Sequence, residues 1–231
     1  MNDFVSRSLD DTMFGMEIYH LLNRGVDKRK IFMEDGDRVR FVHDMFEFND
    51  KEAATNTLRR LEMNDFVSRS FREPIVEIHG WCLMPNHYHL LLSELIDGGL
   101  TLFIRRLNIG YAKFFNDKYK RVGTLFQGRT KKIRITSDPH FLHILHYIHL
   151  NPLDLTRERS WRSFEIKNAH ATLEHLDKYR WSSYLDYCGK ENFPSIISTD
   201  LFKGVFLDYG KAIKSYINDI ELSDIRPFLL E

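Results

Sequence analysis

Two histidines that could bind a metal ion lie two residues apart in Pro85-Asn86-His87-Tyr88-His89. Three leucines follow, and the alternating pattern predicts a β-strand from His87 to Ser93. Because residues two apart on a strand share a face, His87 and His89 would present two imidazoles to one divalent cation. The pair also fits two histidines held by hydrogen bonds alone, so further ligands are needed to distinguish the two interpretations.

A tyrosine and an asparagine supply candidates for the rest of such a site. The sequence predicts a helix from Pro139 to Leu150, which begins after Asp138 as N-cap and ends at Asn151-Pro152. Tyr147 and Asn151 are four residues apart and therefore lie close together at the edge of the apolar helix face. This places a polar pair beside the sheet on which that face must pack.

Four further histidines are spaced three residues apart on the same predicted helix. Because this spacing drifts by about 60° per step around the helix, they cannot all bind one metal ion. We expect most of them to be exposed or at an interface. They are His140, His143, His146 and His149.

Together these residues predict a site for phosphoryl transfer. Two imidazoles and the amide oxygen of Asn151 would leave positions open on Mg²⁺ or Mn²⁺, which could then polarise a phosphate oxygen. Tyr147 would attack the phosphorus and form a phosphotyrosine, and with a free pKa of about 10 it needs assistance at neutral pH. The simpler alternatives are that Tyr147 packs at the core boundary and that Asn151 only ends its helix.

The order of predicted elements indicates an α+β fold with a ferredoxin-like antiparallel sheet and helices on one face. Residues 153–231 are expected to form a helical extension. The predicted elements before the last helix are the strand Glu17–Arg24, the helix Gly36–Asn49, the strands Ile75–Leu83 and His87–Ser93, the helix Leu100–Tyr119 and the strand Thr124–Ile135.

The composition is that of a folded protein. The 231 residues are 43% hydrophobic and 29% charged, with 33 basic and 33 acidic residues, which excludes a highly charged disordered chain. No apolar run is long enough to cross a bilayer, and Met1–Asp11 lack the apolar centre of a signal peptide, so we expect a cytoplasmic protein. Cys82 and Cys188 are too few for a disulfide framework or a four-cysteine zinc site.

Charge is unevenly distributed along the chain. Residues 101–136 contain ten basic residues and one acidic residue, Asp117, with six aromatic residues between them. This combination is typical of a surface that contacts phosphates and stacks on bases. A solvated helix followed by an exposed strand is the alternative.

Five motifs occur in a characteristic order between about Glu17 and Tyr187. They are Tyr19-His20-Leu21-Leu22-Asn23-Arg24-Gly25, Met84-Pro85-Asn86-His87-Tyr88-His89-Leu90-Leu91-Leu92, Gly123-Thr124-Leu125-Phe126-Gln127-Gly128-Arg129, Tyr147-Ile148-His149-Leu150-Asn151-Pro152 and Tyr179-Arg180-Trp181-Ser182-Ser183-Tyr184. The pattern resembles the REP-associated tyrosine transposases and the related single-tyrosine transposases of the HUH endonuclease superfamily.

The resemblance implies cleavage and rejoining of single-stranded or hairpin DNA. It implies that His87, His89 and Asn151 bind Mg²⁺ or Mn²⁺, and that Tyr147 forms a 5′-phosphotyrosine and releases a 3′-hydroxyl. Arg129 is favoured for phosphate contact. The full set of expected DNA-binding residues is Arg105, Arg106, Arg129, Lys131, Lys132 and Arg134.

Tyr111 is a rival nucleophile within the basic segment. Asn116 follows it by five residues, which separates the two by about 140° around a helix and makes a shared metal site poor. Tyr147 is therefore preferred. The alternative function is a DNA-binding or regulatory protein that recognises hairpins without cleaving them.

The resemblance also suggests a domain organisation. It predicts an N-terminal extension at residues 1–16, a catalytic domain at 17–152 with an insertion at 50–72, and the C-terminal extension at 153–231. An octapeptide, MNDFVSRS, occurs at Met1–Ser8 and again at Met63–Ser70, and we attach no chemistry to it. The expected partner is DNA, with association to the nucleoid; monomer and homodimer both remain open.

Overall fold

The computed structural model describes residues 16–52, 72–156, 161, 166 and 168–219. The expected N-terminal extension and the expected insertion lie outside the described residues except at their edges. Both copies of the repeated octapeptide lie outside them as well.

Four strands form one antiparallel sheet, with the spatial order β2-β3-β1-β4. The strands are β1 (Ile18–Arg24), β2 (Val76–Met84), β3 (His87–Glu94) and β4 (Lys131–Arg134). The two central strands are buried along nearly their whole length, which explains why their sequences read as apolar runs. The predicted α+β class with a ferredoxin-like antiparallel sheet is confirmed.

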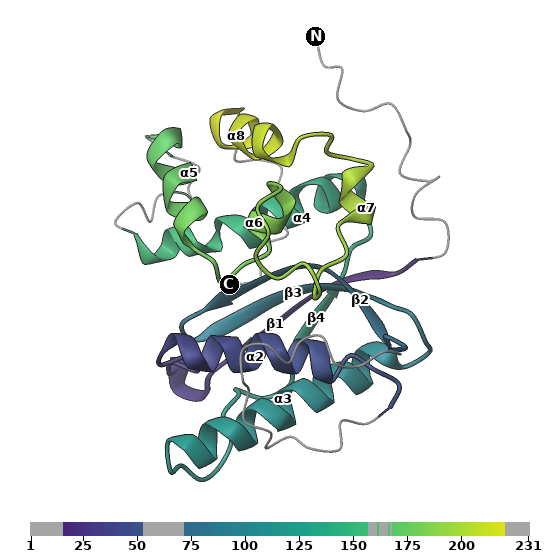
Figure 1. Ribbon diagram of the computed structural model, residues 1–231, viewed down its shortest axis with the longest axis vertical. Coiled ribbons are helices and arrows are strands. Elements are labelled where there is room, and N and C mark those ends of the chain that lie inside the picture. Colours follow the sequence, from purple (N-terminus) through teal and green to yellow (C-terminus); the bar gives the residue numbers. More distant parts are fainter. Residues whose placement is uncertain (1–15, 53–71, 157–160, 162–165, 167, 220–231) are drawn as a thin grey trace.

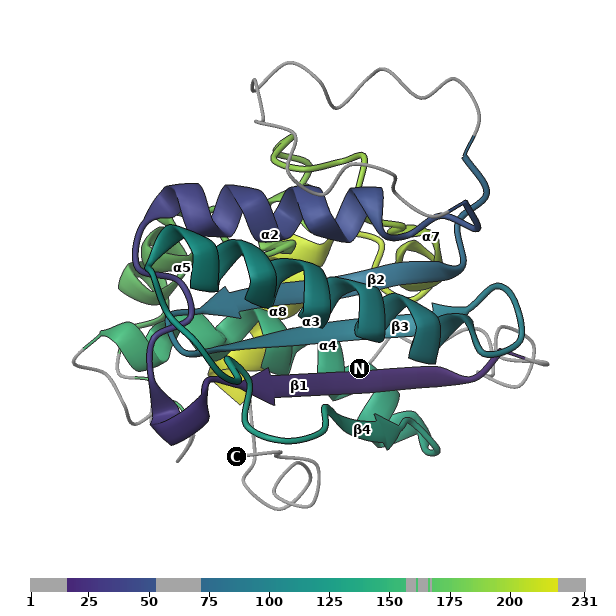
Figure 2. The same ribbon diagram turned by 90° about the horizontal axis from the view of Figure 1, so that it is seen from below.

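Helices α2 (Asp35–Glu47) and α3 (Gly99–Lys118) lie together on one face of the sheet (Figures 1 and 2). They enclose a core with the side chains of β1, β2 and β3 that point toward them. The two helices approach closely at Gly110, where a Cβ atom would lie 2.4 Å from Phe48. These are the helices that the sequence placed on one face.

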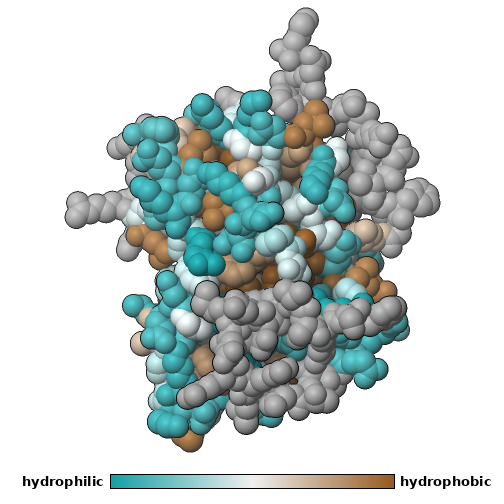
Figure 3. Space-filling view, in the orientation of Figure 1, coloured by the Kyte–Doolittle hydropathy of each residue, from teal (hydrophilic) through white to brown (hydrophobic). Residues whose placement is uncertain are grey.

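The opposite face is also covered. Helix α4 (Asp138–Leu150) packs there, so the sheet lies between two helical layers, as Figure 1 shows. Its outer side is covered by C-terminal elements, and Figure 3 shows hydrophilic side chains over much of that outer layer. After α4 come the 3-10 helix η3 (Asn151–Leu155) and the helices α5 (Ala169–Lys178), α6 (Tyr184–Tyr187), α7 (Asp200–Lys203) and α8 (Tyr209–Asp219).

The C-terminal residues are joined to the sheet by backbone hydrogen bonds. The N–H of Leu83 donates to the carbonyl of Trp181, and the N–H of Ser183 donates to the carbonyl of Trp81, both along the outer edge of β2. The expected helical extension is thus packed on the same body as the sheet. It packs against the side of α4 that faces away from the sheet.

Two expectations for the local structure are wrong. The strand expected at Thr124–Ile135 is limited to the four residues of β4, because the residues before it form a loop that turns at Gly123 and Gly128 with positive φ. The histidines of α4 are mostly buried: His140, His146 and His149 are at most 3% exposed. Of the two expected environments, exposed or at an interface, exposure is wrong. His146 and His149 contact Tyr209 at the start of α8, which covers the outer side of α4.

Within the described part of the chain, no helix is both long enough and apolar enough to cross a membrane.

Candidate active site

His87 and His89 lie side by side on β3, on the face that α4 covers. Their ring centres are 5.0 Å apart, and both side chains are buried, with at most 5% exposed. The strand register pairs His89 with Leu22 and His87 with Arg24, so all four side chains belong to the same face. The expected common direction of the two imidazoles therefore follows from the pleat of the strand.

Each imidazole has a hydrogen bond at its Nδ1 atom. The Nδ1 of His87 lies 2.7 Å from the side-chain oxygen of Asn86, and the Nδ1 of His89 lies 2.9 Å from the Nε2 of His20 on β1. Because the Asn86 oxygen can only accept, the Nδ1 of His87 donates, which makes its Nε2 a lone-pair atom in the neutral ring. The same tautomer of His89 requires its Nδ1 to donate to His20.

Tyr147 reaches this histidine cluster from α4. Its ring centre lies 5.6 Å from that of His89 and 5.8 Å from that of His20, in both cases edge to face. The side chain is 4% exposed and is bordered on another side by Trp161, at a ring distance of 6.0 Å. The helix thus brings the predicted nucleophile against the predicted metal-binding pair.

Asn151 follows one turn later and is fully buried. Its side-chain nitrogen donates to the carbonyl oxygen of Tyr147 at 2.8 Å, so it closes the C-terminal end of α4. The bond uses the amide nitrogen, and the amide oxygen is the side-chain atom whose lone pairs could bind a cation. The two roles considered from the sequence, helix terminus and ligand, are therefore compatible.

The donor set fits a divalent cation. Two neutral imidazole nitrogens and one amide oxygen would supply three ligands and leave positions for phosphate oxygens and water. The described residues contain no group of three or more His, Cys, Asp or Glu side chains placed to hold a metal ion. His20, whose Nε2 lies 2.9 Å from the Nδ1 of His89, is among the residues covered by this statement. A cation at this point would therefore depend on the asparagine.

Tyr111 lies on the other side of the sheet, in the core beneath α2 and α3. Its hydroxyl donates to the carbonyl oxygen of Ile31 at 2.5 Å, and the side chain is fully buried. This burial raises the pKa of Tyr111 well above its ordinary value, since it disfavours the phenolate. Tyr111 thus lies on the face opposite His87 and His89.

Arg106 and Arg134, which are among the expected DNA-binding residues, form polar contacts within the protein itself. The guanidinium of Arg106 donates to the carbonyl oxygens of Asp50, at 2.5 Å, and Lys51, at 3.4 Å. Arg134 forms a 2.8 Å ion pair with Glu17. These contacts give Arg106 a structural task in holding the chain after α2.

The two lysines of β4 lie on different faces of the sheet. Lys131 pairs with Leu22, which also pairs with His89, so Lys131 belongs to the face of the histidine cluster. Lys132 belongs to the opposite face, where its ammonium lies 4.0 Å from the centre of the Tyr19 ring. Of the two, Lys131 is the one directed to the side of the candidate site.

Arg105 and Arg129 are both exposed. Arg129 precedes Thr130, whose hydroxyl accepts hydrogen bonds from Asn23 and Asn108 at 3.0 Å each. These bonds fix the entry into β4 and therefore the position of Arg129. Arg105 lies on α3, separate from this loop.

The sequence analysis assigned no role to His20. A signal was present, because a histidine within the apolar run Ile18–Leu22 must be buried and must find a polar partner. The identity of that partner depends on the register between β1 and β3, which a single sequence does not reveal.

The comparison with known families supports this description. The family described as "Transposase IS200 like" matches residues 18–151, which include both histidines of β3 and the tyrosine of α4. The chain belongs to the IS200-like transposase family. Its family activity is thus DNA transposition, and the predicted membership of a transposase family is confirmed.

The comparison with solved structures includes the REP-associated tyrosine transposase bound to a REP hairpin. That structure is 13% identical in sequence, with a TM-score of 0.46, and the match covers 87% of this chain and 93% of the other. No curated protein matches the chain.

Proposed function

We propose that this IS200-like transposase cleaves and rejoins single-stranded or hairpin DNA through a covalent phosphotyrosine at Tyr147, with Mg²⁺ or Mn²⁺ as cofactor. One observation carries the proposal: the Tyr147 ring lies 5.6 Å from that of His89, whose neighbour His87 has the tautomer that leaves Nε2 as a lone pair. Membership of a transposase family supports the use of this arrangement in DNA chemistry.

In this mechanism the phenolic oxygen of Tyr147 attacks a DNA phosphorus. A bond forms between that oxygen and the phosphorus, the bond to the 3′ oxygen breaks, the phenol loses its proton and the 3′ oxygen gains one. The products are a 5′-phosphotyrosine and a free 3′-hydroxyl, and attack by another 3′-hydroxyl reverses the step and joins two strands. A cation bound by His87, His89 and Asn151 would polarise the attacked phosphate.

The buried surroundings of Tyr147 have their own part in the reaction. The rings of His20, His89 and Trp161 border the phenol and restrict its rotation. A nucleophile held in one orientation loses less entropy on reaching the transition state. The carbonyl of Tyr147 accepts a hydrogen bond from the side chain of Asn151, which joins the two residues at the end of the helix.

The experiment uses labelled single-stranded hairpin oligonucleotides from the DNA that flanks the gene. The full chain is incubated with them in Mn²⁺ or in chelator, and denaturing gels separate a protein-linked product. We expect an adduct in Mn²⁺ that is absent in chelator and absent in Tyr147→Phe.

Tyr111→Phe is the matched control. It removes one hydroxyl from a buried tyrosine on the other face of the sheet and should leave the adduct unchanged. Hairpin binding without any adduct would favour the non-cleaving regulatory protein. An adduct lost in Tyr111→Phe but kept in Tyr147→Phe would overturn the assignment of the nucleophile.

A further inference from the structure

The loop between β1 and α2 exposes three consecutive basic side chains, Lys28, Arg29 and Lys30. Residues 25–30 contain one acidic residue, Asp27, which leaves a net charge of +2 on six residues. Within the described ranges, none of the three cations has a carboxylate within 4.0 Å, whereas Lys118 nearby binds Glu34 at 2.6 Å. Adjacent like charges repel, so this arrangement costs stability unless an anion binds it.

The backbone of this loop is fixed. It begins with the 3-10 helix η1 (Val26–Lys28), and Asp27 and Lys28 have positive φ angles of 55° and 56°. The chain folds back tightly at Gly25, where a Cβ atom would lie 2.4 Å from the carbonyl oxygen of Arg29. The N–H of Ile31 then donates to the carbonyl of Pro85. The three cations therefore project from a loop with a fixed backbone, residues 25–30, which we call the platform.

A second basic segment, residues 121–130, lies against this platform. Gly25 pairs with Phe126 in an isolated bridge, and the N–H of Val26 donates to the carbonyl of Leu125 at 2.9 Å. The segment contributes Arg121 and Arg129 and contains no acidic residue. The Arg121 guanidinium donates to the side-chain oxygen of Asn116 at 2.9 Å. Burial first, and then the charge of Arg29, lowers the pKa of Arg121.

The platform is connected directly to the candidate active site. The side chain of Asn86 donates to the carbonyl of Lys28 at 3.3 Å and accepts from the Nδ1 of His87 at 2.7 Å. Arg24, at the end of β1, is the register partner of His87. The loop that carries the three cations is thus linked through Asn86 to His87, at the end of the sheet where β3 begins.

From this juxtaposition we infer that Lys28, Arg29 and Lys30, together with Arg121 and Arg129, form a surface that binds the phosphates of the DNA strand next to its point of cleavage. The inference rests on the proposed function and deepens it by placing the path of the strand over the β1–α2 loop. Of these five residues, Arg121 and Arg129 belong to the basic segment at residues 101–136, and only Arg129 was among the expected DNA-binding residues. Cations on fixed backbone bind phosphates with less loss of entropy, which favours this loop over a flexible basic tail.

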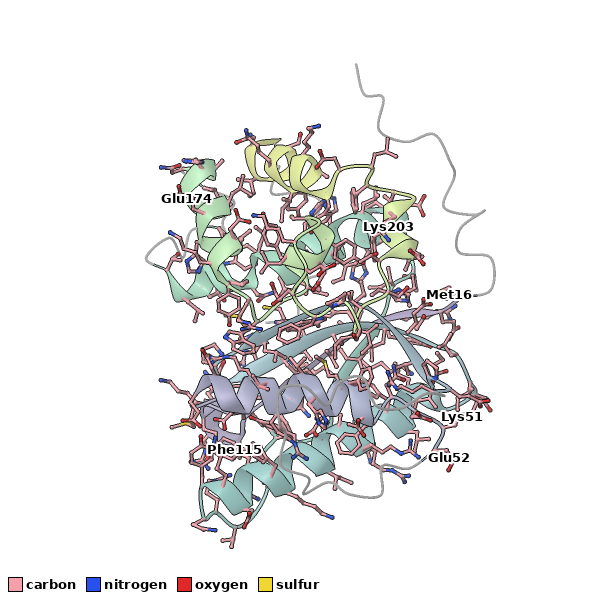
Figure 4. The ribbon with its side chains drawn as sticks, viewed as in Figure 1. Met16, Lys51, Glu52, Phe115, Glu174 and Lys203 are labelled. Atoms are coloured by element: carbon pink, nitrogen blue, oxygen red, sulfur yellow. The ribbon has the colours of Figure 1, made fainter. Side chains whose placement is uncertain are left out.

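The test measures binding without cleavage. A fluorescently labelled single-stranded hairpin oligonucleotide from the flanking DNA is titrated with the full chain in chelator, at several salt concentrations between 0.05 and 0.3 M, and anisotropy gives the affinity. The variant combines Lys28→Gln, Arg29→Gln and Lys30→Gln. The control combines Lys203→Gln, Lys211→Gln and Lys214→Gln, which remove the same charge from exposed positions on α7 and α8; Figure 4 shows Lys203 in that outer layer.

Each phosphate contact adds about 0.7 to the slope of log affinity against log salt for a single strand. The loop variant should therefore lower the slope by about 2 and weaken binding roughly tenfold to 100-fold at 0.1 M salt. The control variant should keep the wild-type slope. Thermal melting checks that both variants are folded.

Two outcomes overturn the inference, and they differ in what else they affect. If the wild-type chain binds and the loop variant has the same slope and affinity, or if the control variant loses as much, the surface is wrong and the proposed function stands. If the wild-type chain binds neither hairpin nor unstructured single strands, the proposed function fails as well.

Discussion

At the scale of single residues, the chemistry depends on which nitrogen of each histidine carries the proton. Asn86 settles this for His87, because an amide oxygen can only accept. If the proton of His20 is on its Nδ1, its Nε2 accepts from the Nδ1 of His89, and the Nε2 of His89 then carries the lone pair. Both partners therefore act through the histidines as positioning residues in the proposed metal site.

This relation gives a prediction for His20→Ala. Loss of the 2.9 Å bond frees the His89 ring to rotate or change tautomer, so affinity for Mn²⁺ should fall about 10- to 100-fold. Calorimetry of the full chain with Mn²⁺ and no DNA measures this directly. The control is His79→Ala, which removes a buried histidine that bonds to Ser93 on the same sheet. Equal losses in both variants would show that His20 acts only through stability.

The sequence identifies candidate residues by type and spacing, but it says little about which of them are bound to other groups of the protein. It identified His87, His89, Tyr147 and Asn151 because their types and spacing are unusual, and the structure brings at least the first three together. The number of basic residues in a segment does not show which of them form hydrogen bonds within the protein. Arg106 bonds to backbone carbonyls across the fold, and such contacts depend on tertiary structure that local spacing does not encode.

At the scale of elements, the close approach of α2 and α3 depends on a glycine, Gly110, at their contact. Gly110→Ala should destabilise the protein by about 1–3 kcal/mol, because a methyl group would lie 2.4 Å from the Phe48 ring and force α2 and α3 apart. Alanine by itself favours a helix by about 1 kcal/mol over glycine, so a net loss would identify the clash. Urea unfolding measures the difference.

The control for this prediction is Gly204→Ala. Gly204 follows α7, is exposed, and an added Cβ would meet no atom within 4 Å among the described residues. Its unfolding free energy should change little. An increase in stability for Gly110→Ala would contradict the close packing of α2 on α3.

Element types and order were predictable, whereas their environments were only partly so. The strands β1, β2 and β3 and the helices α2, α3 and α4 have the expected types because their periodicity and end signals are local. The short length of β4 was not predictable, because the extent of this strand depends on its pairing with β1. The burial of the α4 histidines was missed because the cover that buries them comes from distant residues such as Tyr209, which bonds to both His146 and His149.

At the scale of the whole molecule, buried histidines link stability to pH. Burial lowers the pKa of His79 and His140 to about 4 and that of His146 to about 3, so the native state keeps them neutral. The unfolded chain binds a proton at each below its ordinary pKa of about 6.5. Stability is therefore fully present above pH 6.5 and falls as the pH decreases toward 4.

The expected slope is roughly 1 kcal/mol per pH unit for each such histidine. Urea unfolding at pH 7.5, 6.5 and 5.5 should show a progressive decrease in the free energy of unfolding. His146→Gln removes one titrating group and should make the decrease shallower. A free energy of unfolding that stays constant or rises between pH 7.5 and 5.5 would contradict the native burial of these rings.

The central claim is that Tyr147 carries the DNA during strand transfer. The most direct measurement is to form the adduct with a hairpin oligonucleotide in Mn²⁺, digest the DNA and the protein, and locate the attached nucleotide by mass spectrometry. We expect a 5′-linked nucleotide on the peptide that contains Tyr147. A nucleotide on Tyr111 or on any other residue, or a cleaved strand with no attached protein, would contradict it.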